Sequence, residues 1–212
     1  MLFRSEMPEI ECPLKILFDQ EIKPANLKEK FLCATFEIIA EKGADALSAS
    51  VLIKRTKSSK GALFHHFQTI DHLCIQSLEY FKQQVALGAA PDSCQNLEEY
   101  LQHVMDIGVR RNSTRYYAHL VNFFRDRAIR DERFRAPLKA FFLAHIKIVA
   151  ERVVQFLEPG VDRSVVFRKI VFYLMVIERC SYHRLLYQEP SAFDGELEEL
   201  HSFILRSLRN IK

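Results

Sequence analysis

Apolar residues recur at steps of three and four along most of the chain, which is the period of an amphipathic α-helix. In the segment KEKFLCATFEIIAEKG, Leu32, Phe36 and Ile39 fall on one face and charged residues occupy the opposite face. Gly43 follows directly, in the position where glycine commonly ends a helix. The pattern therefore predicts a helix over residues 26–42.

The same periodicity predicts eight further helices. Ser48 and Thr69 stand where side-chain hydroxyls cap helix N-termini, and Ser59 opens the segment between them. Six glycines and seven prolines leave little material for hairpin turns. The chain is expected to be all-α with about nine helices, the further eight lying near 48–55, 59–66, 70–87, 95–110, 113–129, 136–157, 163–187 and 194–210.

The chain is expected to divide at the segment GAAPDS, residues 88–93, whose small residues, glycine and proline are typical of a linker. This boundary separates a smaller helical domain, 26–88, from a larger one, 94–212. Residues 1–25 form an N-terminal extension. Its acidic side chains outnumber its basic ones, so we do not expect it to act as an arm on DNA.

Composition excludes several classes of protein. The net charge is +3, 49% of residues are hydrophobic and 27% are charged, which is ordinary for a soluble domain. Five scattered cysteines form no CxxC pair, so reduced thiols are expected rather than a disulfide framework or a metal site. Cys180 and His183 lie one turn apart, but two such residues do not make a metal centre. No apolar run reaches membrane-spanning length and no secretory signal is evident, so a cytoplasmic protein without a cofactor is expected.

The stretch TKSSKGALFHHF, Thr56 to Phe67, departs from this ordinary composition. From Lys54 to His66 there are four basic side chains and no acidic one, an excess larger than that of the whole chain. Two short helices joined by a tight turn form a helix-turn-helix when longer helices support them. Gly61 would lower helix stability, but it would also let the backbone approach another surface closely. A solvated charged face is the alternative interpretation.

The first third of the chain resembles the TetR family of transcriptional regulators. FLCATFEIIAEKG (31–43) is similar to the first helix of that family, and SKGALFHHF (59–67) is similar to its recognition-helix signature. TIDHL (69–73) then opens the following helix. The resemblance covers about residues 27–75 and implies binding to a double-stranded DNA operator.

Carried over by position, the resemblance implies roles for individual side chains. The hydroxyls of Ser48 and Ser59 would cap helices or meet phosphate, and Lys60 through Ala62 would face base edges. Phe64 and His65 would lie along the DNA backbone. The expected DNA-binding residues are Ser48, Lys57, Ser59, Lys60, Gly61, Ala62, Phe64 and His65.

For residues 94–212 the resemblance implies a domain that binds an effector and forms a homodimer. The last two helices have wider apolar faces than one helical layer covers, so their pairing with a second copy would give a four-helix interface. Burial of both helices within one subunit is the alternative. The residues expected at the interface are Leu174, Ile177, Leu197, Leu200, Ile204 and Leu208.

The effector is expected to be a small apolar or aromatic molecule that releases the dimer from its operator, and the resemblance implies that the dimer is a repressor. Aromatic side chains with a few polar groups could line an apolar cavity for it. The residues expected there are Tyr116, Tyr117, His119, Phe123, Phe141, His145 and Phe172.

The sequence leaves two other function classes to consider. An enzyme is disfavoured because the chain has no GxSxG or HExxH motif and no phosphate-cradling glycine loop. A TetR-like ligand-binding or protein-interaction module that has lost operator binding is the stronger alternative. It is suggested by Lys57, Ser58 and Ile70, which differ from the residues usual in the family at those positions.

Overall fold

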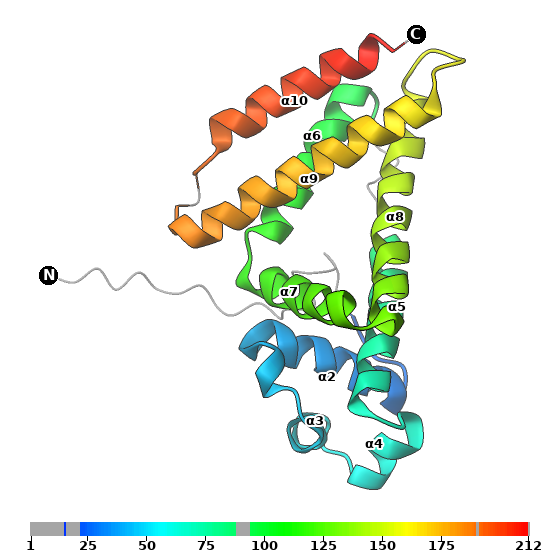
Figure 1. The fold of residues 1–212 in the computed structure, drawn as a ribbon, viewed down its shortest axis with the longest axis vertical. Helices are drawn as coiled ribbons and strands as arrows, with labels where there is room; N and C mark the ends of the chain where they lie inside the picture. The colour runs from blue at the N-terminus through cyan, green and yellow to red at the C-terminus, as the bar shows by residue number, and fades with distance from the viewer. Residues whose placement is uncertain (1–14, 16–21, 88–93, 190, 212) are drawn as a thin grey trace, which may run out of the picture.

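The computed structural model describes residues 15, 22–87, 94–189 and 191–211, and within these ranges it contains helices and no strand (Figure 1). The predicted all-α fold is confirmed. The elements are α2 (Leu27–Lys42), the short 3-10 helix η1 (Ala44–Ala46), α3 (Ala49–Thr56), α4 (Lys60–His66), α5 (Ile70–Leu87), α6 (Leu97–Asn112), α7 (Arg115–Arg130), α8 (Glu132–Gln155), α9 (Arg163–Tyr187) and α10 (Asp194–Arg209).

Side-chain caps explain where several helices begin. Asn26, Ser48 and Ser59 each accept a backbone N–H from the first turn of α2, α3 and α4 respectively. Thr69 does the same for α5, accepting the N–H of His72 at 3.0 Å. Gly43 ends α2 with φ 82°, a left-handed value that glycine adopts readily. Of these signals, Gly43, Ser48, Ser59 and Thr69 were predicted from the sequence, and the cap at Asn26 was not.

Helix α8 differs from its predicted range because it begins at Glu132 rather than at 136. The Asp131 carboxylate accepts the N–H of Arg133 at 2.9 Å and so satisfies a first-turn donor one turn earlier. Pro137 consequently lies inside the helix instead of opening it. A start at 136 would have placed this proline in the first turn, where proline is commonest.

The helices form two groups that pack against each other (Figure 1). The short helices α3 and α4 lie at one end of the molecule with α2, and α7 packs against α2. At the other end α9 packs against α6, α8 and α10. Helix α5 runs from the end of α4 toward α8 and contacts both α2 and α8.

Three hydrophobic clusters hold this arrangement. One lies among α2, α3, α4 and α5 and contains Phe31, Leu63 and Phe67. A second joins α2 and α5 to α7 and α8, and a third fills the space among α6, α8, α9 and α10. Helices α2 and α5 each contribute to two clusters. A shift of α7 or α8 would therefore also displace α2 and α5, which pack against α3 and α4.

The predicted linker at 88–93 and most of the predicted extension 1–25 lie outside the described residues, and the domain division stays a prediction. None of the described helices combines the length and hydropathy that a membrane span requires. Within the same ranges, no group of three or more His, Cys, Asp or Glu side chains is placed to hold a metal ion.

Candidate nucleic-acid interface and ligand cavity

A tight left-handed turn at Lys57 connects α3 to α4. Lys57 has φ 52° and ψ 47°, a conformation that costs a non-glycine residue about 1 kcal/mol. The N–H groups of Lys57 and Ser58 both donate to the Ile53 carbonyl, which satisfies the end of α3. The Ser58 hydroxyl also shares a 2.7 Å hydrogen bond with the Thr56 hydroxyl. Lysine therefore occupies the turn without changing its tight geometry.

The two faces of α4 have different environments. Leu63 and Phe67 are buried in the cluster with α2, as their spacing predicted. Lys60, Gly61 and His65 are exposed, and so is Phe64, whose side chain is 38% exposed. Ala62 is half-buried at the edge of this surface. Four of the predicted DNA-binding residues thus share one open surface on a helix that is fixed from behind.

Gly61 is not required by the interior of the protein. A Cβ built at this position would meet only the Ser59 Oγ, at 3.8 Å, which is ordinary van der Waals contact. Its φ is not positive either, so backbone conformation does not call for glycine. Glycine at position 61 leaves the outer surface of α4 without a side chain at that point.

The basic cluster is smaller than its sequence indicated. Arg55 pairs with Glu37 at 3.2 Å and with Glu41, so its charge is directed toward α2. Lys54, Lys57 and Lys60 are exposed, and none of them makes an ion pair with another described residue. The positive charge available to a partner on α3 and α4 is carried by these lysines.

The hydroxyls of Ser48 and Ser59 are occupied as caps. Ser48 Oγ accepts the N–H of Val51 and shares a hydrogen bond with the Ser50 hydroxyl at 3.1 Å. Ser59 Oγ accepts the N–H of Ala62 at 3.1 Å. Both retain lone pairs, but their established role is to fix where α3 and α4 begin.

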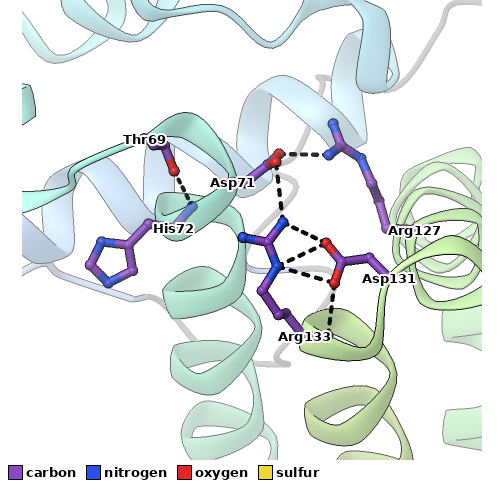
Figure 2. A network of polar contacts seen from close by, with 6 residues as sticks. All are labelled: Thr69, Asp71, His72, Arg127, Asp131 and Arg133. Carbon is purple, nitrogen blue, oxygen red and sulfur yellow. Dashed lines mark hydrogen bonds and ion pairs between the residues drawn. The ribbon is translucent and has the colours of Figure 1, made fainter.

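A polar network connects the start of α5 to the corner between α7 and α8 (Figure 2). Arg127 Nη1 lies 2.6 Å from Asp71 Oδ1, while Arg133 bridges Asp71 and Asp131. The hydrogen bonds from Arg133 lower the pKa of Asp131. Asp71 stands only a few residues after α4, so this network ties the helix-turn-helix to the two helices that approach the cavity described next.

A cavity of about 400 Å³ lies among α6, α7, α8 and α9. Its size falls within the range of small-molecule sites. Three of the predicted effector residues line it, namely Tyr117, Phe141 and His145. Ile148 and Met175 also line it while remaining exposed, which places an opening between α8 and α9.

The other predicted effector residues lie elsewhere. Tyr116 and Phe123 are buried in the cluster that α7 forms with α2 and α5. His119 lies outside the cavity and its Nδ1–H donates to the Ala40 carbonyl at 2.8 Å, which makes it a link between α7 and α2. Phe172 is on the outer face of α9 and is 50% exposed. These residues differ because helical spacing alone does not say which face of α7 or α9 meets which neighbour.

The cavity combines apolar walls with internally balanced charges. Arg125 pairs with Glu178 at 2.6 Å and stacks 5.5 Å from the Phe142 ring centroid. Burial, together with nearby Arg111, lowers the pKa of His145 to about 4, so its imidazole is neutral at pH 7. Burial raises the pKa of the Tyr117 hydroxyl. The walls are therefore suited to a ligand of low charge.

Sequence reasoning missed the side of the cavity formed by α6. His103, Gly108, Arg111 and Asn112 all line it. At Gly108 an added Cβ would lie 2.8 Å from Ile177 Cγ2, so the glycine permits the close approach of α6 and α9. A glycine inside a strongly helical segment was the signal that could have pointed to this contact.

The predicted interface residues are placed differently from what a dimer contact requires. Ile177, Leu197, Leu200, Ile204 and Leu208 are buried in the cluster of α6, α8, α9 and α10 within one chain, and Leu174 lines the cavity. The alternative, burial within one subunit, describes these side chains. The exposed apolar side chains on the same two helices include Phe172 and Phe203, at 50% and 53%, together with Met175, Leu186 and Tyr187 near or beyond the middle of α9.

Acid is expected to destabilise the protein through His145. Because its pKa is lowered on folding, the unfolded chain binds more protons between pH 4 and 6.5, so this group's stabilisation is lost as pH falls through that window. From pH 7 to pH 5 the loss is about 2 kcal/mol. Urea unfolding of His145→Gln should show a pH dependence weaker by that amount. His65→Gln, at an exposed position, is the control, and equal pH dependence in all three proteins would contradict the assignment.

Comparison with known sequences shows which family the helix-turn-helix matches. A sequence model of the bacterial regulatory proteins of the TetR family matches residues 31–76, which include α3, α4 and the start of α5. The helix-turn-helix segment of this chain is therefore that of the TetR family. The matched segment contains every exposed residue of α4 described above.

The relatives agree with this assignment. The HTH-type transcriptional regulator QacR of Staphylococcus aureus is 30% identical over 101 residues, which are 46% of this chain and 51% of QacR. The match thus spans about half the length of that relative. A transcriptional regulator from Rhodococcus has the same fold with a TM-score of 0.66 at 18% identity, covering 86% of this chain and 97% of its own. A second Rhodococcus protein, assigned to the TetR-family regulators, gives 0.61 at 20% identity and covers 87% and 97%.

Proposed function

We propose that this protein is a homodimeric transcriptional repressor of the TetR family that binds a double-stranded DNA operator through α4 and is released by a small apolar effector. The exposed surface of Lys60, Gly61, Phe64 and His65 is the observation that carries the DNA-binding part. A lysine beside a glycine lets the helix lie deep in the major groove while a charge reaches phosphate or a guanine edge. The cavity supplies the site for the effector.

The test is binding of the purified full chain to DNA from its own promoter region, measured by fluorescence anisotropy at about 50–200 mM salt. We expect binding that survives competitor DNA and weakens steeply as salt increases. Weak binding that is equal on every sequence would favour the alternative, a TetR-like module without an operator. The turn at Lys57 remains tight and hydrogen-bonded to the end of α3 despite its left-handed lysine, which supports the first outcome.

Gly61→Ala should change stability and DNA binding in opposite directions. The new methyl meets no clash inside the chain, so helix propensity should stabilise the fold by about 0.5 kcal/mol in urea unfolding. The same methyl points away from the core, so it should hold α4 off the groove and weaken operator binding by about tenfold or more. Ala140→Ser, which adds one side-chain atom at an exposed position of α8, is the control and should leave DNA binding unchanged. Equal operator affinity for Gly61→Ala would contradict close approach at Gly61.

The polar network at Asp71 offers a path from the cavity to α4. A ligand that shifts α7 or α8 would move Arg127 and Arg133, which hold the start of α5. The recognition helices of a dimer must lie about 34–36 Å apart, or one turn of DNA, to reach successive major grooves. An effector that prefers a different spacing would therefore release the operator.

The homodimer is proposed to form through the outer faces of α9 and α10. Phe172, Val176 and Phe203 line one groove between these helices. Helices α9 and α10 lie side by side along one side of the molecule, away from α3 and α4 (Figure 1). A two-fold pairing there would leave the α4 surface of each subunit free for DNA.

A further inference from the structure

One exposed face of α10 carries opposite charges on the two sides of a phenylalanine. Glu199, Phe203 and Arg206 are exposed and follow one another at steps of four and three, so they lie along a single stripe of the helix. Glu196 continues the stripe three residues earlier and is also exposed. Glu199 is the sixth residue of α10, beyond the first turn in which the helix dipole favours acidic side chains, so the dipole does not account for this order.

The same stripe borders a groove between α9 and α10. The groove is lined by Glu199, Phe203 and Arg206 together with Phe172 and Val176 of α9. The two phenylalanine side chains are about half exposed in the single chain. Among the residues that the structure describes, the side chains of Glu199 and Arg206 make no ion pair or hydrogen bond. An apolar surface flanked by available charges of both signs is suited to a complementary protein surface.

The order of the charges distinguishes the two ways in which a second copy could lie on this groove. Two-fold symmetry allows the α10 helices of two copies to run parallel or antiparallel. In a parallel pair centred on Phe203, each Glu199 would face the same glutamate of the other copy, and each Arg206 the same arginine. Like charges held opposite each other are repulsive, so the parallel pair is disfavoured.

The antiparallel arrangement brings opposite charges level with each other. Glu199 lies four residues before Phe203 and Arg206 lies three residues after it, which are about 6 Å and about 4.5 Å along the helix axis. When two antiparallel helices meet at Phe203, Glu199 of one copy therefore comes within about 1.5 Å, measured along the axis, of Arg206 of the other. Two-fold symmetry makes this pair twice.

We infer that the groove receives a second copy of this chain whose α10 runs antiparallel, with Phe203 at the two-fold axis and Glu199 of each copy paired with Arg206 of the other. The inference rests on the proposed homodimer and adds the orientation, the register and the charges that select the partner. Burial of the phenylalanine side chains stabilises the dimer, and the two crossed ion pairs determine how the helices are aligned.

Charge reversal of either residue is the first part of the test. Glu199→Arg and Arg206→Glu each convert both crossed pairs into like-charge contacts, so the dimer dissociation constant should rise about 30-fold in either variant. A chain that carries both substitutions restores opposite charges and should dimerise like the original protein. Light scattering coupled to size-exclusion chromatography over a concentration series measures all three. Circular dichroism checks that the helices are retained.

Mixing the two single variants is the second part. A mixed dimer pairs arginine with glutamate at both crossed positions, whereas each single variant alone opposes like charges. Native mass spectrometry should therefore show mixed dimers favoured about 30-fold over random pairing. Glu158→Arg and Lys139→Glu make the same charge changes at exposed positions outside α9 and α10. These two control variants should dimerise like the original protein and mix at random.

Dimers of Glu199→Arg or Arg206→Glu that are as tight as the original would overturn the inference, because a parallel pair or a contact on another face predicts that result. Random mixing of the two single variants would overturn it as well. If the original protein is dimeric in either case, the proposed homodimer stands and only its antiparallel alignment is rejected. An original protein that stays monomeric at every concentration would reject both.

Discussion

Charge reversal at Lys60 is expected to abolish specific operator binding at physiological salt. Lys60 is the first residue of α4, is exposed, and makes no ion pair with another described residue, so its charge is available to DNA. One base-edge or phosphate contact contributes about 1–3 kcal/mol, and a dimer makes the contact twice. Lys60→Glu adds repulsion from phosphate, so the operator dissociation constant should rise about 100-fold or more.

The measurement is a titration of labelled promoter DNA with each protein across a salt series. The slope of affinity against salt should become shallower in Lys60→Glu, because fewer counterions are released. Lys139→Glu makes the same change at an exposed position of α8 and serves as the matched control. If Lys60→Glu and Lys139→Glu bind the operator alike, α4 is not the helix that contacts DNA.

Phe172→Glu is expected to convert the protein to a monomer. The side chain is half exposed in the single chain, so its replacement should leave the fold of each subunit intact. In the proposed interface two phenylalanine side chains would be buried, each stabilising the dimer by about 1.5–3 kcal/mol, and a glutamate there would bury an unpaired charge. The dimer dissociation constant should therefore rise at least about 100-fold.

Light scattering coupled to size-exclusion chromatography measures whether Phe172→Glu is a monomer or a dimer. The operator titration then measures how loss of the dimer changes DNA binding. Ile129→Glu is the matched control, because Ile129 is 76% exposed at the far end of α7 and lies on neither α9 nor α10. A stable dimer in Phe172→Glu would place the interface on another face. A monomer that still binds the operator with full affinity would show that dimerisation is not needed for recognition.

The local sequence determined most of the helices and their ends. The periodicity that predicted α2, and the hydroxyl caps at Ser48 and Ser59, act within one or two turns, so they need no knowledge of distant residues. The inward face of α4 followed in the same way, since Leu63 and Phe67 are one turn apart. The family assignment also came from one short segment, which is the part that the family comparison matches.

Tertiary structure decided which face of each later helix meets which neighbour. Leu197 and Ile204 belong to a wide apolar face, and the sequence allowed that face to be covered either by a second copy or by α6 and α9. The packing of α10 on those helices buries it within one chain. His119 was likewise a plausible ligand contact until α2 proved to lie beside it.

The charge on the helix-turn-helix shows the same division. Sequence alone counted Arg55 with the lysines, because nothing local reveals that Glu37 and Glu41 on α2 face it across the helix pair. The cavity, too, depends on distant contacts, because its walls come from four helices and Gly108 permits the close approach of α6 and α9. The sequence by itself determined the helices, their caps and the exposed surface of α4, since these depend on neighbours within a few residues. The cavity, the paired charges and the free apolar surface depend on contacts between residues far apart in the chain, and only the folded arrangement selects among them.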